Sequence, residues 1–136
     1  MKPLMYKGQR VQGYWVDEDG NVWSYKRGGG RNAHILPANI SGKSKYPNVC
    51  FRHEGRSVTA AIHRLVAESS IKRPRPKEFR SEIWNILNDR EKDLVYQAYE
   101  VNHIDHDVTN YHPLNLEWVS RKTNIKKRND HYSYMN

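Results

Sequence analysis

The sequence has one cysteine, no long apolar run and a shortage of acidic residues, and each of these excludes a class of protein. Cys50 stands alone among 136 residues, so the chain forms no internal disulfide and no cysteine-based zinc site. No apolar run reaches the roughly 18 residues that suggest a membrane span. The first residues, MKPLMYKGQR, lack the apolar core of a secretory signal. We therefore expect a cytoplasmic protein that is not secreted and has no membrane partner.

The charge of the chain points to a polyanionic partner. Lys and Arg number 23 against 15 Asp and Glu, which gives a formal net charge of +8 at pH 7. A basic surface attracts polyanions through its field and through counterion release. Nucleic acid is the leading candidate, and an anionic membrane surface is the alternative. Although only 37% of the residues are hydrophobic, the four Trp and nine Tyr argue against general disorder.

Turn signals and β-prone runs predict an antiparallel β region over residues 1–59. GYWVDEDGNVWSY (13–25) places two aromatic runs around Asp-Gly and Gly-Asn steps, which predicts a hairpin. YPNVCFR and RSVTA, joined at HEG, predict a second hairpin, in which we expect Cys50 to be a small core residue. Between them, KRGGGRNAH (26–34) is either a solvated loop or a loop that contacts phosphate. It is not a Walker loop, because no Gly-Lys-Ser/Thr follows the glycines.

Residues 60–99 are predicted to be mainly helical. AAIHRLVAES (60–69) repeats its apolar residues at helical spacing. His63 lies beside that apolar stripe, and two interpretations stay open: a partly buried histidine satisfied by backbone, or a residue that braces an active site or contacts phosphate together with Arg64. The two prolines of IKRPRPKEF predict a linker or a basic arm.

SEIWNILNDREKDLVYQAY (81–99) is predicted to form one helix or two short ones, because the polar DREKD run stands in its middle. Its apolar residues are expected to share one stripe, formed by Ile83, Leu87, Leu94 and Ala98.

The last third of the sequence predicts a ββα unit: a strand at 100–105, a loop at 106–115, a strand at 116–120 and a helix from about 121 to 130. EVNHIDHDVTN places His103 at the end of the first strand, where a purely structural strand has little reason to be so polar. A histidine with a pKa near 6.5 can act as the base that activates water on a phosphodiester. A hard divalent cation can neutralise the phosphoryl oxygens, and amide oxygens such as those of Asn102 and Asn124 are suitable ligands.

The block VNHIDHDVTNYHPLNLEWVSRKTNIKKR resembles the HNH motif of phage and intron-encoded homing endonucleases. AAIHRLVAE and GYWVDEDGNVWSYKRG are similar to two blocks that precede the motif in those proteins. The resemblance implies an α+β fold with an N-terminal antiparallel β region, a helical middle and a C-terminal ββα-metal motif. It divides the chain into a DNA-binding region (1–59), a helical connector (60–99), the nuclease motif (100–130) and a tail (131–136).

The same resemblance implies a metal-dependent DNA endonuclease, either nicking one strand or cutting both. His103 would be the general base. Asn115 would brace the loop and orient His103. Asn102 and Asn124 would hold Mg²⁺ or Mn²⁺, with Asn124 also counted among the catalytic residues. The chain departs from the family at position 102, where many members have Asp or His, and at Tyr111, where they often have a second Asn.

Two further roles in the motif are weighed from the residues themselves. Asp105 either supplements the metal ligands or hydrogen-bonds the loop, and the second role is preferred. His106 and His112 are not expected to bind zinc, because neither a cysteine nor a His-x₃-His spacing accompanies them.

The predicted partner is double-stranded DNA, bound by a monomer or a homodimer, in the cytoplasm of a bacterial host if the chain is phage-encoded. The alternative is a non-catalytic DNA-binding regulator with the same fold. A third, less favoured hypothesis is a structural or RNA-binding basic protein. The basic residues expected to contact DNA lie near turns of the β region and in RKTNIKKR: Lys26, Arg27, Arg31, Lys43, Lys45, Arg52, Arg56, Arg121, Lys122, Lys126, Lys127 and Arg128.

Overall fold

The structure is a computed structural model that describes residues 1–25, 33–40, 45–73, 75–76 and 79–121. The chain divides into two compact units. Unit 1 comprises residues 1–72 and 103–117, and unit 2 comprises residues 73–102 and 118–136. Within the described ranges, no helix combines the length and the apolar character needed to cross a membrane.

Unit 1 begins with a four-stranded antiparallel sheet in the order β1-β2-β3-β4. Its strands are β1 (Lys2–Tyr6), β2 (Gln9–Val16), β3 (Val22–Ser24) and β4 (His34–Ile35). The hairpin predicted over 13–25 is confirmed: β2 pairs with β3, with Trp15 opposite Trp23. The Asp17 carboxylate closes the turn, because it accepts hydrogen bonds from the backbone N–H groups of Asp19 and Asn21.

The second predicted hairpin is also confirmed, as β5 (Asn48–His53) pairs with β6 (Arg56–Ala61). Cys50, however, is exposed, so the expectation that it belongs to the core is wrong. Side chains alternate between the two faces of a strand. In β5 this alternation buries Val49 and Phe51, which are 1% and 2% exposed, and turns Cys50 to the other face.

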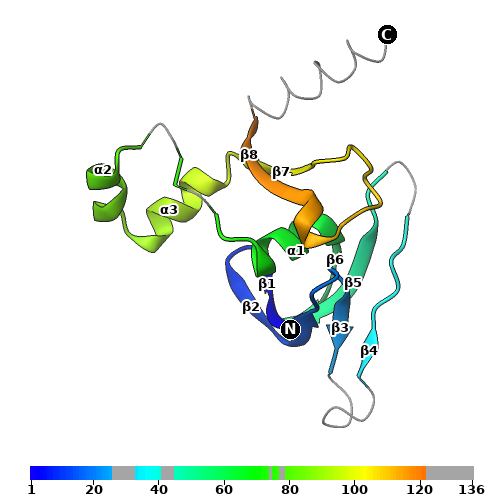
Figure 1. Cartoon of the computed structure of the whole chain (residues 1–136). Coiled ribbons are helices and arrows are strands. Elements are labelled where there is room, and N and C mark those ends of the chain that lie inside the picture. Colours follow the sequence, from blue (N-terminus) through cyan, green and yellow to red (C-terminus); the bar gives the residue numbers. More distant parts are fainter. Residues whose placement is uncertain (26–32, 41–44, 74, 77–78, 122–136) are drawn as a thin grey trace. The chain divides into compact units, whose positions relative to one another are not determined.

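Helix α1 (Ile62–Ser70) begins directly after β6 and packs on β1 (Figure 1). As the helical spacing predicted, Ile62, Leu65 and Val66 are buried. Full burial of a side chain such as Leu65 contributes about 2 kcal/mol. The backbone N–H of Met5 donates to the Ser69 hydroxyl at 2.9 Å, which ties the end of the helix to β1.

Unit 2 contains two short helices, α2 (Ser81–Ile86) and α3 (Asp89–Tyr96). The break between them is stabilised by Asn88, which forms a capping box with Glu91 at the start of α3. Because the chain changes direction there, residues spaced for one continuous helix do not share a face, and the predicted apolar stripe is wrong. Ile83 and Leu94 are 49% and 59% exposed. Trp84 is buried instead, and its ring forms T-shaped contacts with the rings of Phe79 and Tyr96.

Strands β7 (Tyr99–His103) and β8 (Leu116–Ser120) form a two-stranded sheet, with a short 3₁₀ helix (Pro113–Asn115) just before β8. These are the two strands predicted for the ββα unit. The expected helix from about 121 to 130 lies outside the described residues except for Arg121. Antiparallel strands with few helices make this an α+β fold, as predicted. The division at residues 59, 99 and 130 stays a prediction.

Candidate functional site

His103 ends β7 and is the buried polar residue of that strand, with 5% of its surface exposed. Val101 and His103 take the buried positions of β7, and Glu100 and Asn102 take the half-buried positions between them. Consecutive side chains of a strand point to opposite faces. The strand therefore turns the imidazole of His103 inward and the amide of Asn102 to the other face.

Two aromatic rings from other parts of unit 1 contact His103. The ring of Tyr46 stacks on His103 at 5.7 Å between centroids, with 27° between the ring planes. The ring of His63, from the first turn of α1, lies 4.9 Å from that of His103 and 4.6 Å from that of Tyr46. Tyr46, His63 and His103 are called the ring cluster below.

Two nitrogens of the ring cluster have no hydrogen-bond partner among the residues that the structure describes. Nε2 of His103 and Nδ1 of His63 are buried, and no group in the described part of the chain hydrogen-bonds to either. An unpaired buried polar atom costs about 1–3 kcal/mol, so such atoms in folded proteins often have a catalytic role or bind an ion or a water. These two nitrogens mark the ring cluster as a candidate site.

Burial keeps both imidazoles neutral. Burial, followed by the charges of His103 and Arg64, lowers the pKa of His63 to about 4. Burial also lowers the pKa of His103, although the carboxylates of Asp105 and Asp107 act in the opposite direction. A neutral imidazole has one nitrogen with a free lone pair, so His103 is in the state that can accept a proton.

The loop after β7, residues 104–115, is called the polar loop below. Hydrogen bonds between Asp105 and Asn115 connect its two ends. The Asn115 side-chain amide donates to Asp105 Oδ1 at 2.9 Å and to the Asn110 carbonyl at 2.8 Å. The backbone N–H of Asp105 donates back to Asn115 Oδ1 at 3.0 Å. Asp105 also accepts from the Asn110 amide and from the backbone N–H of Asp107. These hydrogen bonds lower the pKa of the Asp105 carboxyl and keep it ionised.

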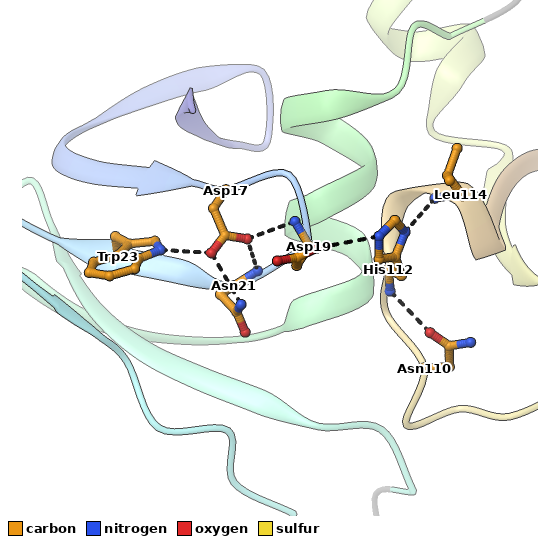
Figure 2. Close-up of polar contacts among 7 residues, drawn as sticks. All are labelled: Asp17, Asp19, Asn21, Trp23, Asn110, His112 and Leu114. Carbon is orange, nitrogen blue, oxygen red and sulfur yellow. Dashed lines mark hydrogen bonds and ion pairs between the residues drawn. The ribbon is translucent and has the colours of Figure 1, made fainter.

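The polar loop also contacts the β2–β3 turn (Figure 2). His112 accepts a hydrogen bond from the Leu114 N–H through Nδ1, and its Nε2 lies 3.6 Å from Asp19 Oδ1. Gly20 lies so close to the Tyr111 carbonyl that a Cβ atom at position 20 would overlap it. The turn therefore supports the loop that begins directly after His103.

No protein-family model and no curated protein matches the chain. A solved structure does match: that of the HNH homing endonuclease I-HmuI, which describes DNA binding and cleavage by that enzyme. The match has a TM-score of 0.61 at 23% sequence identity. It covers 88% of this chain and 53% of that one, so the chain spans about half the length of its neighbour.

The chain has an HNH-like fold. This agrees with the fold that the resemblance of residues 101–128 implied. The roles assigned to single residues are a separate matter, and they stay predictions.

In the HNH-like fold, unit 1 brings together only part of the predicted site. His103 and Asn115 both belong to unit 1: His103 directly precedes the polar loop, and Asn115 is its last residue. Asn102 belongs to unit 2, and Asn124 lies outside the described residues. Histidines 106 and 112 also lie in the polar loop, and His112 contacts Asp19.

The predicted DNA contacts are described for four residues, and all four are exposed: Lys45, Arg52, Arg56 and Arg121. Arg52 is partly engaged, because its guanidinium donates to the Gly55 carbonyl at 3.0 Å and lies 3.3 Å from the Ser57 hydroxyl. The other predicted contacts lie outside the described residues: Lys26, Arg27, Arg31, Lys43, Lys122, Lys126, Lys127 and Arg128.

The described residues contain no group of three or more His, Cys, Asp and Glu that could hold a metal ion. The carboxylate of Asp105 already accepts several hydrogen bonds within the loop. Asn102 provides an amide oxygen, which suits a hard cation that draws most of its ligands from water and substrate. The expectation that the chain uses Mg²⁺ or Mn²⁺ and not zinc stays a prediction.

Sequence reasoning missed Tyr46 and left His63 undecided. Both residues lie far from His103 in the sequence, and no local motif links them to it. Two signals were available for His63: its place next to the apolar stripe of a helix, which fits a structural residue equally well, and its place in AAIHRLVAE, one of the blocks that resemble the homing endonucleases. Tyr46 had no signal at all.

Proposed function

We propose that this protein is a metal-dependent DNA endonuclease of the HNH type, with His103 as its general base. The observation that carries the proposal is the buried, neutral imidazole of His103 in a chain of HNH-like fold, with an Nε2 that no described residue hydrogen-bonds. A structural histidine in the same place would be expected to use both ring nitrogens.

The chain's own contribution to the reaction is the movement of one proton. A water molecule attacks the phosphorus of a DNA phosphodiester, and Nε2 of His103 takes the proton that this water loses. The bond from phosphorus to the leaving sugar oxygen breaks, and that oxygen takes a proton from solvent water. Because Nε2 is buried, the attacking water must gain access to it before the proton is transferred. Asn115 keeps the polar loop, and with it the end of β7, in one conformation.

A bound Mg²⁺ or Mn²⁺ would stabilise negative charge on the phosphoryl and leaving oxygens. In this proposal Asn102 and Asn124 would hold the ion; because Asn102 and His103 are adjacent in β7, both serve one site only if the strand twists where it ends. Neutral amides bind such a cation more weakly than carboxylates do, so the DNA phosphate supplies part of the affinity.

The proposed substrate is double-stranded DNA, held mainly by charge. The net charge of +8 favours a polyanion, and the exposed Lys45, Arg52, Arg56 and Arg121 can contact phosphates. The known activity of I-HmuI on DNA supports the same substrate by analogy of fold. A homing role follows if the preferred site lies in the chain's own genomic neighbourhood.

The test compares wild-type protein with the His103→Ala variant on supercoiled plasmid and on DNA from the gene's own surroundings, with Mg²⁺ or Mn²⁺. We expect the wild type to nick or cut, and the variant to lose about 100-fold or more in rate, since general-base catalysis contributes about 10²–10⁴-fold. Retardation of DNA in a gel should be unchanged by the substitution, because His103 is buried.

Two results would contradict the proposal. Equal cutting by the variant would show that His103 is not the base. A wild type that retards cognate DNA but never cuts it would favour the non-catalytic regulator. EDTA serves as the control for the metal, because it should abolish cutting and leave gel retardation in place.

A further inference from the structure

The β5–β6 hairpin brings two members of the ring cluster, Tyr46 and His63, together. Tyr46 lies just before β5 and His63 lies just after β6, so the two residues flank the open end of the β5–β6 hairpin. Asn48 pairs with Ala61 at that end of the ladder. The Ile62 N–H also donates to the Pro47 carbonyl at 2.9 Å, which joins the neighbours of His63 and Tyr46 directly.

The contact between His63 and His103 is made by ring surfaces. The two centroids are 4.9 Å apart with 52° between the planes, and Nδ1 of His63 makes no hydrogen bond to any described residue. Aromatic rings at such distances restrict each other by packing. An imidazole at the end of a strand would otherwise rotate about its χ2 torsion, which is broad and weakly restricted in histidine.

We infer that His63 is a positioning residue for His103. The inference rests on the proposed function. His63 and Tyr46 together hold the imidazole of His103 in one orientation, so that Nε2 is already aimed when the substrate arrives. Rates depend strongly on such alignment, and a displacement of about 1 Å at a reacting group can cost about 10²-fold.

If His63 positions His103 by packing, its aromatic ring is needed for this role and its nitrogens are not. His63→Phe keeps an aromatic ring of similar size and removes the nitrogens, whereas His63→Leu keeps apolar volume and removes the ring. His63→Ala removes both, and His63→Leu covers the case in which the alanine variant fails to fold. Ile86→Ala, at an 80% exposed position of α2, serves as the control for substitution itself.

The kinetic test measures kcat and KM for plasmid cleavage. We expect kcat of His63→Leu and His63→Ala to fall at least about tenfold, with KM within about twofold of the wild-type value, because orientation acts on the chemical step. His63→Phe should recover kcat to within about threefold of wild type. If His63 only filled space in the core, kcat of His63→Leu would be at least as high as kcat of His63→Phe. That result would overturn the inference.

A second readout does not depend on cleavage. In the wild type, the ring currents of Tyr46 and His63 should shift the Cε1–H resonance of His103 away from the value of free histidine in a ¹H–¹³C spectrum. The shift should persist in His63→Phe and move toward the value of free histidine in His63→Leu. An unchanged resonance in His63→Leu would overturn the inference. A wild type that never cuts DNA, but whose His103 resonance still depends on the ring at position 63, would overturn the proposed function and support the positioning of His103.

Discussion

At the scale of single residues, burial determines the protonation state of the site. His63 and His103 lie against each other, and each imidazole would be costly to charge without water around it. Two neighbouring imidazoles also disfavour each other's protonation. The site therefore holds two neutral rings at neutral pH, which is the state a general base requires.

His63 should make the stability of the protein depend on pH. Its pKa is about 4 in the folded state and 6.5 as an unperturbed group, so below pH 6.5 the unfolded chain binds a proton that the folded chain does not. The free energy of unfolding should fall as the pH decreases from 6.5 to about 4, by up to about 3 kcal/mol, and then level off. Urea denaturation at a series of pH values measures this fall.

The matched variant for this measurement is His63→Phe, which keeps a ring and cannot titrate. The difference in unfolding free energy between wild type and variant should be constant above pH 6.5 and change steadily below it. Parallel curves down to pH 4.5 would mean that His63 titrates normally in the folded protein.

At the scale of elements, local sequence signals predicted both hairpins, α1 and the strands β7 and β8. Turn residues such as Asp17 and Gly20 act on their immediate neighbours, so they can be recognised without the rest of the fold. The burial of Trp84 in place of Ile83 could not be predicted in that way, because the break at Asn88 changes the direction of the chain.

The support of the polar loop by the β2–β3 turn can be tested at Gly20. Gly20 has φ +89° and would place a side chain against the Tyr111 carbonyl, so Gly20→Ala combines backbone strain with steric overlap. Gly55, with φ +76° and open space around it, has the strain alone. We expect Gly55→Ala to lower the free energy of unfolding by about 1 kcal/mol. Gly20→Ala should lower it by at least about 2 kcal/mol more than that. If urea denaturation showed the same loss of unfolding free energy in both variants, the β2–β3 turn and the polar loop would not be in close contact at Gly20.

At the scale of the whole molecule, the fold could be predicted from sequence further than the site could. The motif block implied the HNH-like fold, and His103 stands at the end of its first strand. The ring cluster could not be predicted, since Tyr46 and His63 reach His103 through the pairing of β5 with β6 and the placement of α1. Such contacts depend on how elements pack, and no spacing in the sequence records them.

DNA binding can depend on the net charge of the whole chain or on phosphate contacts made by single residues. The salt dependence of binding distinguishes these two contributions. Each phosphate contact contributes about −0.9 to the slope of log K against log salt concentration. Arg56, exposed at the β5–β6 turn, is a predicted contact, and Arg90, exposed on α3, is not. Both Arg56→Ala and Arg90→Ala remove one positive charge, yet only Arg56→Ala should make the slope shallower by about 0.9.

Fluorescence anisotropy with a labelled duplex between about 50 and 200 mM KCl measures these slopes, over the range in which such contacts change affinity most visibly. A general electrostatic attraction would weaken binding slightly and equally in both variants. Equal slopes for the two variants would therefore remove Arg56 from the DNA interface and attribute the affinity to the net charge of +8 and to the remaining basic residues.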